Sequence, residues 1–143
     1  MNDFSSNLLE TIEEATAFGE LHGWVILPNH YHILCHVQDI KKAKISLGHL
    51  HGRSAFNWNR HDMVRGRKVW FRSAETVIKS RRHFQATLNY VHQNPIKHGC
   101  VSSLRDWPWS SFSDWRSRVG LVMAVQICRG LNINKDGISW EKA

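Results

Sequence analysis

Two short apolar runs, separated by a proline and an asparagine, constrain the fold more than any other feature of the chain. The first run covers residues 24–27, and the second, residues 31–37, is rich in amino acids that favour strands. Pro28 and Asn29 interrupt the chain between the two runs. The pattern predicts two consecutive strands joined by a tight connection.

Helical patterns flank these strands. Asn7, with Glu10 three residues later, is typical of a helix start, and apolar residues at helical spacing follow until Gly19 or Gly23. A second amphipathic helix is predicted over about residues 41–60, with basic residues on its outer face. The hairpin is therefore expected between two helices.

The second half of the chain predicts one more strand and one more helix. Residues 69–71 favour a short strand, and Ser80 can cap a helix. This helix should end around Asn94 and Pro95, because a proline disfavours helical angles in the residue before it. The order helix, strand, strand, helix, strand, helix is an α+β pattern, close to a split βαβ unit that lacks its first strand.

Length and composition favour a folded protein with a reducing environment. With 143 residues, 42% of them hydrophobic and 22% charged, we expect one domain over residues 1–118 and a tail over 119–143 to which the sequence assigns no role. The chain has no C-x-x-C pair and an odd number of cysteines, Cys35, Cys100 and Cys128. A signal peptide and a membrane span are not expected, so the prediction is a cytoplasmic protein that does not bind membranes.

The charge of the chain is distributed unevenly. Residues 1–40 contain no lysine or arginine and six acidic residues, whereas the other 103 residues contain all 19 basic residues and six acidic ones. Such a distribution favours a surface for a polyanion, of which nucleic acid is the commonest, about as strongly as it favours a solvated basic face.

The basic residues that we expect to contact nucleic acid form three groups. They are Lys41, Lys42, Lys44 and Arg53 on the second predicted helix, Arg65, Arg67 and Lys68 in the following loop, and Lys79, Arg81 and Arg82 at the start of the third helix. The third group opposes the helix dipole, which is understandable if phosphates neutralise it.

His30 and His32 are two residues apart in a predicted strand. Their imidazoles should project from one face, and Tyr31 from the other. Two nitrogen donors on one face can hold a divalent metal. A pair of histidines alone is weak support for a metal site, because in a chain with ten histidines it is more often structural.

Tyr90 is the other tyrosine of the chain, and so the only phenol that could serve the histidine face. Asn94 follows one helical turn later, which would place its carboxamide oxygen on the same helix face. A site with nitrogen and oxygen donors suits manganese or magnesium better than a thiolate site would. Pro95 argues against a helical Asn94, and a half-buried structural tyrosine is the plainer alternative for Tyr90.

Four segments in this order resemble one protein family. They are Leu27–Leu34 (LPNHYHIL), Gly66–Trp70, Leu88–Gly99 (LNYVHQNPIKHG) and Asp106–Phe112 (DWPWSSF), and together they extend over roughly residues 7–115. These segments resemble the single-tyrosine transposases of the HUH nuclease superfamily, and within it most closely the REP-associated tyrosine transposases.

The resemblance implies both a fold and an activity. The fold would be ferredoxin-like, an antiparallel sheet with helices on one face. His30, His32 and Asn94 would bind Mg²⁺ or Mn²⁺, and Tyr90 would be the nucleophile. The protein would then be a metal-dependent transposase or nickase that cleaves and rejoins single-stranded, hairpin-forming DNA through a 5′-phosphotyrosine.

The chain departs from the family pattern at its start. Family members usually have a strand before the first helix, and here only residues 1–6 precede the predicted helix. Without that strand, the histidine-bearing strand would expose unpaired backbone, which a second copy in a homodimer could cover. The alternative function is an inactive, truncated or domesticated transposase that binds structured DNA or RNA without cutting it.

Several other residues have two interpretations. His36 could join a structural metal site, and His83 and His92 could shuttle protons near Tyr90, although packing roles are commoner. Trp107, Trp109 and Phe112 could either stack on unpaired bases or cover the core.

Overall fold

A computed structural model describes residues 2–17, 19–120, 123–124 and 127. As far as they are described, residues 1–20 and 35–73 form one compact unit, and residues 21–34 and 74–143 form a second. Of the predicted tail, residues 121–122, 125–126 and 128–143 lie outside the described part, and Cys128 with them. The assignment of residues 1–118 to one domain stays a prediction.

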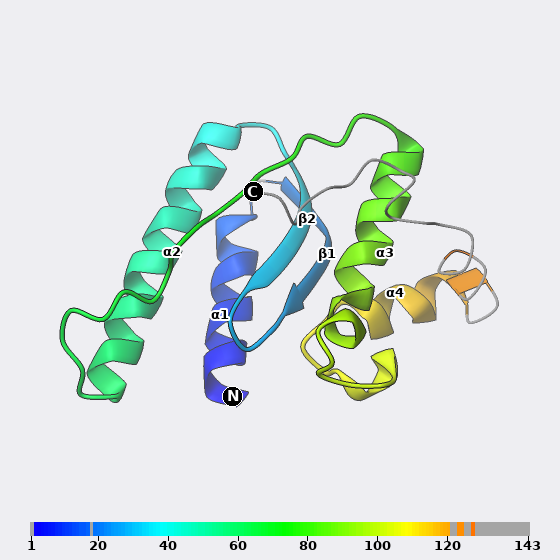
Figure 1. Cartoon of the computed structure of the whole chain (residues 1–143). Coiled ribbons are helices and arrows are strands. Elements are labelled where there is room, and N and C mark those ends of the chain that lie inside the picture. The colour runs from blue at the N-terminus through cyan, green and yellow to red at the C-terminus, as the bar shows by residue number, and fades with distance from the viewer. Residues whose placement is uncertain (1, 18, 121–122, 125–126, 128–143) are drawn as a thin grey trace. The chain divides into compact units, whose positions relative to one another are not determined.

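The described elements follow an α+β order, as predicted from the sequence (Figure 1). In chain order they are α1 (Asn2–Ala15), β1 (Gly19–Ile26), β2 (Tyr31–Val37), α2 (Ile40–His61), α3 (Arg81–Lys97), the 3-10 turn η1 (Leu104–Asp106) and α4 (Phe112–Val119). The ferredoxin-like arrangement, with helices on one face of the sheet, stays a prediction.

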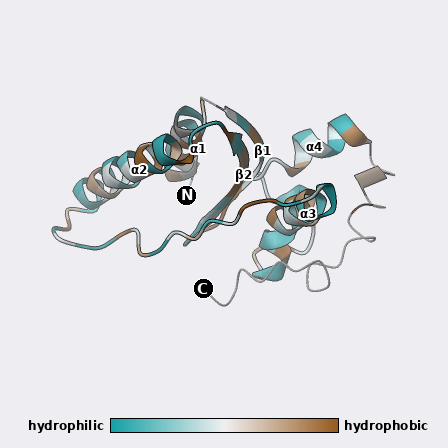
Figure 2. Ribbon diagram, turned by 90° about the horizontal axis from the view of Figure 1, so that it is seen from above, coloured by the Kyte–Doolittle hydropathy of each residue, from teal (hydrophilic) through white to brown (hydrophobic). Residues whose placement is uncertain are grey.

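The two strands β1 and β2 form an antiparallel sheet, and their tight connection is confirmed. The Leu27 N–H donates to the His30 carbonyl at 2.8 Å, across the two connecting residues. Gly19 begins β1 instead of closing the first helix. The position requires glycine, because a Cβ atom there would collide with the His36 carbonyl. The strands carry much of the hydrophobic colour in Figure 2.

Residues 109–111 cover the other edge of β1. The Ile26 N–H donates to the Trp109 carbonyl and the Ser111 N–H to the Trp24 carbonyl, both at 2.9 Å. Val25 and Ser110 form an antiparallel bridge between these two bonds. Within the residues that the structure describes, β2 pairs with no strand but β1.

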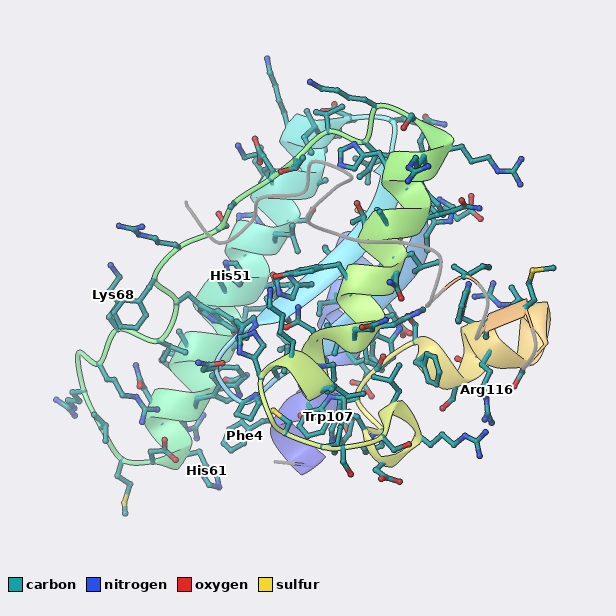
Figure 3. The ribbon with its side chains drawn as sticks, turned by 45° about the vertical axis from the view of Figure 1, so that its right-hand side comes forward. Phe4, His51, His61, Lys68, Trp107 and Arg116 are labelled. Carbon is teal, nitrogen blue, oxygen red and sulfur yellow. The ribbon has the colours of Figure 1, made fainter. Side chains whose placement is uncertain are left out.

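In the first unit, α1 and α2 lie side by side (Figure 1). Leu8, Ile12 and Leu50 are buried there. The prediction that α1 starts near Asn7 was wrong: it starts at Asn2, because the Phe4 ring packs edge-on against Trp58 of α2 at 5.3 Å and extends the apolar face by a turn. Figure 3 shows Phe4 close to His61, the last residue of α2.

The strand predicted over residues 69–71 does not form. The chain from residue 64 to residue 79 has no helix or strand, and side chains of α2 hold part of it. Trp70 donates its indole N–H to the Ser54 hydroxyl at 2.8 Å and stacks on the His51 ring. The apolar pattern therefore reflects packing of an extended segment against a helix rather than pairing in a sheet.

In the second unit, α3 extends to Lys97 and includes Pro95, contrary to the predicted end near Asn94. Ser80 caps the start as predicted, since its hydroxyl accepts the His83 N–H at 3.0 Å. At the other end, Gly99 has a φ of 68°, which glycine adopts without strain. The N–H groups of Gly99 and Cys100 bond to Ile96 and Pro95, a Schellman motif that fixes where the helix ends.

The core of the second unit lies between β2, α3 and the C-terminal segment. Leu34, Leu88, Phe112, Trp115 and Ala124 form one buried cluster. A second cluster joins Val25, Leu27 and Val91, with Trp107 packed against it. The Trp107 indole N–H also donates to the Ile26 carbonyl at 3.0 Å. Trp107 and Phe112 thus cover the core.

Candidate active site

The second unit brings together all four residues that the sequence singled out for chemistry. His32 lies within β2, whereas His30, which was predicted to lie in the same strand, directly precedes it, because its carbonyl closes the tight connection by accepting the Leu27 N–H. Tyr90 and Asn94 lie one turn apart on α3. The His32 ring meets the His30 ring at 5.1 Å and the Tyr90 ring at 5.3 Å between centroids. Asn94 is helical despite Pro95, so its side chain reaches His30 as well.

The His30 imidazole lies between two asparagines. Its Nδ1 atom is 2.6 Å from Asn29 Oδ1, and its Nε2 atom is 3.3 Å from Asn94 Oδ1. Burial lowers the pKa of His30, which favours the neutral ring with a single proton. The shorter contact assigns that proton to Nδ1, because an amide oxygen only accepts. Nε2 then points a lone pair at the Asn94 oxygen.

Two buried polar atoms near this ring have no hydrogen-bond partner. They are Nε2 of His32 and Nδ2 of Asn94. Buried polar atoms without a partner are rare, and each calls for an explanation such as an absent ion. If the Asn94 carboxamide rotates by 180°, it donates to His30 Nε2; unrotated, it offers an oxygen. The amide can therefore serve the site either as a donor or as a metal ligand.

The pKa of His32 is lowered to about 4, first by burial and then by the nearby His30, His98 and Lys97. His32 is therefore neutral at physiological pH. A neutral imidazole with a buried, unshared nitrogen is the form of histidine that binds metals. Within the described residues, however, no three His, Cys, Asp or Glu side chains are placed to hold a metal, so a site needs the Asn94 amide.

Tyr90 is buried, and its ring faces a cation as well as a histidine. The Lys97 ammonium lies 5.1 Å from the centre of the Tyr90 ring, two helical turns further along α3. The other tyrosine, Tyr31, has its pKa raised to about 12 by burial, which makes it a poorer source of phenolate. Of the two tyrosines, Tyr90 is the one whose ring meets the His32 ring.

The other histidines near the site have structural surroundings. His92 binds the Ser111 hydroxyl through Nε2 at 2.9 Å and contacts the Trp115 ring. His83 accepts the Lys79 N–H at 3.2 Å near the start of α3. His36 is exposed, and the described residues form no histidine cluster that includes it. Neither shuttling by His83 and His92 nor a metal at His36 gains support.

The ten predicted DNA-binding residues are all exposed, and they divide between the two units. In the first unit, Arg53 pairs with Glu14 at 3.3 Å and Arg67 with Asp62 at 2.7 Å. The members of the second unit are Lys79, Arg81 and Arg82. Their role in binding DNA stays a prediction.

Sequence reasoning missed three residues of the site: Asn29, Lys97 and His98. The His98 ring lies 4.9 Å from that of His30, and Asn29 orients the same ring. All three belong to the segments that carry the family resemblance. The spacing of seven residues between Tyr90 and Lys97 would have placed both on one helix face, but Pro95 argued against a helix there.

Comparisons with known proteins agree with the resemblance that the sequence segments show. No model of a protein family matches the chain. A protein of Haemophilus influenzae, provisionally named REP-associated tyrosine transposase, is 30% identical over 123 residues, which cover 78% of this chain and 68% of that protein. The chain belongs to this family.

Two further relatives of the REP-associated tyrosine transposase family agree with this assignment. The REP-associated tyrosine transposase of Escherichia coli K12 is 26% identical over 102 residues, covering 65% of this chain and 54% of that protein. A solved structure of a REP-associated tyrosine transposase bound to a REP hairpin superposes with a TM-score of 0.61, at 23% identity, over 78% of this chain and 67% of that one. The latter likeness shows a shared fold.

The helices of the chain were also compared with the requirements of a membrane span. Among the described residues, none of them is both long and apolar enough to cross a bilayer.

Proposed function

We propose that the chain cleaves and rejoins single-stranded, hairpin-forming DNA, with the Tyr90 phenol as the nucleophile. The observation that carries this proposal is the meeting of His30, His32, Tyr90 and Asn94 within one unit, with buried polar atoms that have no partner. The REP hairpin bound by the solved family member supports hairpin DNA as the substrate.

The donor atoms of the site fit a divalent cation, Mg²⁺ or Mn²⁺. Nε2 of His30, Nε2 of His32 and Oδ1 of Asn94 would hold it. This set explains why a lone pair of His30 faces an amide oxygen and why a buried nitrogen of His32 lacks a partner. The Nδ1–H of His30 donates to Asn29, as the second nitrogen of a metal-binding histidine commonly does. When bound, the ion would neutralise charge on the scissile phosphate.

Tyr90 then needs help to become a nucleophile, since a free phenol has a pKa of about 10 and is mostly protonated at neutral pH. Burial of its ring against the His32 ring restricts the rotamers of the Tyr90 side chain. The Lys97 ammonium would stabilise negative charge that develops on the phenol oxygen and on the phosphate. Both effects favour attack of the Tyr90 oxygen on phosphorus over attack of a water molecule on the same atom.

In the cleavage step, a bond forms between the Tyr90 oxygen and phosphorus while the bond from phosphorus to the 3′ oxygen breaks. The phenol proton passes to solvent, and the departing oxygen takes up a proton and becomes a 3′-hydroxyl. The energy of the broken bond is kept in the 5′-phosphotyrosine. A 3′-hydroxyl can therefore reverse the step, and rejoining needs no nucleotide hydrolysis.

The alternative is a binding module that recognises structured DNA without cutting it. Exposed basic residues in both units, and the 54% of the Escherichia coli relative's length that the chain covers, favour this second candidate. Such a module would keep the hairpin affinity and its dependence on salt, but would form no covalent intermediate.

Incubation of the full chain with a single-stranded hairpin oligonucleotide and Mn²⁺, followed by a denaturing gel, separates the two functions. The wild-type chain should give a covalent protein–DNA band that Tyr90→Phe does not give. Tyr31→Phe, which alters the only other tyrosine, is the matched control and should keep the band. Hairpin binding without any band would favour the binding module, and a band from Tyr90→Phe would exclude Tyr90 as the nucleophile.

A further inference from the structure

The segment after α2, residues 62–73, is basic and held in place by one helix. It contains Arg65, Arg67, Lys68 and Arg72 against the single acid Asp62. All five side chains are exposed. In Figure 1 the segment turns back at the end of α2 and runs along that helix, within the first unit.

Side chains anchor this segment at two places. Asn59 of α2 donates to the Arg67 carbonyl at 2.9 Å and accepts from the Arg67 side chain at 2.8 Å. Three residues later, Trp70 bonds to Ser54 and lies 4.5 Å from the His51 ring, nearly parallel to it. Strands in a sheet are held by backbone hydrogen bonds, whereas this segment is held by side chains of α2. Lys68 and Phe71 remain exposed.

Phe71 is the residue that this arrangement leaves outside. Its side chain is 72% exposed, although Trp70 beside it packs inward. The Lys68 ammonium lies 5.1 Å from the centre of the Phe71 ring, and Figure 3 shows Lys68 on the side of the segment away from α2. An exposed phenylalanine among four exposed cations is poorly suited to an apolar protein partner, because docking would bury those charges.

We propose that Phe71 and Lys68 form a contact for an unpaired nucleotide, in which a base stacks on the Phe71 ring and Lys68 binds the adjacent phosphate. Proteins bind single strands with this combination of an aromatic face and cations along the backbone. The inference rests on the proposed function, since it names where this chain would hold the single-stranded part of its DNA. It does not require that Tyr90 be active.

Fluorescence anisotropy with labelled oligodeoxythymidine of about twenty nucleotides, long enough for several stacked bases, tests the contact. Phe71→Ala should weaken binding by about fivefold or more, and Phe71→Trp should preserve it. Binding of a blunt duplex of equal length should not change. Phe56→Ala, at a phenylalanine of α2 that is 66% exposed, is the matched control and should bind as the wild type does. Thermal melts should stay unchanged, because Phe71 packs little.

Lys68→Gln tests the other half of the contact. It should reduce the dependence of log affinity on log salt by about 0.7, the value for one phosphate on a single strand. Equal binding of oligodeoxythymidine by wild type and Phe71→Ala would overturn the proposal, as would an equal loss for duplex. So would a change in oligomeric state on light scattering without a change in DNA affinity, which would indicate a protein partner.

The outcome is separable from that of the proposed function. If the wild-type chain forms no covalent adduct but Phe71→Ala binds oligodeoxythymidine weakly, the contact stands and the cleavage activity fails. If the adduct forms at the wild-type rate and affinity for both DNAs is unaffected by Phe71→Ala, the contact alone fails.

Discussion

Both faces of α3 contact histidine and aromatic rings, but the surroundings of these rings differ. On one face, His92 contacts Phe112 and Trp115 and reaches the Ser111 hydroxyl at 2.9 Å. On the other face, Tyr90 and Asn94 meet the histidines of the hairpin. Both faces are buried, but only the first resembles an ordinary core.

The hydrogen bonds explain the difference. The Ser111 hydroxyl accepts the Trp24 N–H at 2.9 Å and has one proton, which the Trp24 carbonyl takes at 3.3 Å. His92 Nε2 must therefore donate, and its remaining lone pair on Nδ1 is the least costly atom to leave without a partner. On the Tyr90 face, lone pairs point at one another instead. The core face leaves one buried nitrogen without a partner, Nδ1 of His92, whereas the other face leaves two, Nε2 of His32 and Nδ2 of Asn94, at the place where we propose that a cation binds.

Trp115→Ala should show the largest effect on the core face. Trp115 is buried between α3 and the C-terminal segment, and removing such a ring typically lowers the free energy of unfolding by about 3–5 kcal/mol. Urea denaturation measures this loss. Adduct formation per folded molecule should remain, because the Trp115 ring packs against His92 and Phe112 on the core face of α3. A loss below about 1 kcal/mol would show that this face is not a packed core.

The pH dependence of stability should come partly from His92. Burial lowers its pKa from 6.5 to about 4 in the folded chain, so the unfolded chain binds more protons between these values. The stability that a neutral His92 provides is present above about pH 6.5 and decreases as the pH falls to about 4, by up to about 3 kcal/mol. Unfolding curves at pH 7 and pH 5 should differ more for the wild type than for His92→Gln, because only the wild type loses this contribution as the pH falls. An identical slope in the variant would contradict this account.

His32→Ala should act on the other face without a loss of stability. Removing a ligand should weaken Mn²⁺ binding by about 100-fold or more, since even the loss of an outer partner costs about 10- to 100-fold. Calorimetric titration measures the affinity, and the free energy of unfolding should stay equal or rise because a partnerless buried nitrogen disappears. His36→Ala, at an exposed histidine of β2, is the control and should bind Mn²⁺ normally. Unchanged Mn²⁺ affinity in His32→Ala would exclude the proposed donor set.

Lys97→Gln should give the smallest effect. An exposed charge near the phenol is screened by water, so we expect adduct formation at saturating DNA to slow about five- to tenfold, and Lys97→Arg to recover most of the rate. Lys79→Gln removes an exposed cation at the start of the same helix. It should weaken DNA binding slightly without changing that rate. A rate loss shared equally by both glutamine variants would mean that Lys97 only contributes to binding.

Local patterns predicted the second strand of the hairpin and its connection, whereas β1 starts at Gly19, five residues before the predicted apolar run 24–27. The range 31–37 matches β2, because alternation and the Pro28 break are properties of neighbouring residues. The resemblance to a family brought Asn94 to attention even though the proline beside it argued against a helix. Its placement near His30 agrees with that resemblance, while its role as a ligand stays a prediction.

Long-range contacts account for what the sequence did not predict. The start of α1 depends on Phe4 meeting Trp58, which is more than fifty residues away, and no periodicity within the helix encodes that contact. The absence of a strand over residues 69–71 depends on Trp70 reaching α2. The end of α3 could have been predicted, since a glycine at position 99 is a known stop signal that here outweighs Pro95.

Mass spectrometry of the trypsin-digested covalent adduct tests the central claim most directly. The two tyrosines fall on different tryptic peptides, residues 83–97 for Tyr90 and residues 1–41 for Tyr31. We predict a 5′-phosphonucleotide on Tyr90 within the peptide 83–97, formed only when Mn²⁺ or Mg²⁺ is present. Modification of the peptide 1–41, or of 83–97 at a residue other than Tyr90, would contradict the account.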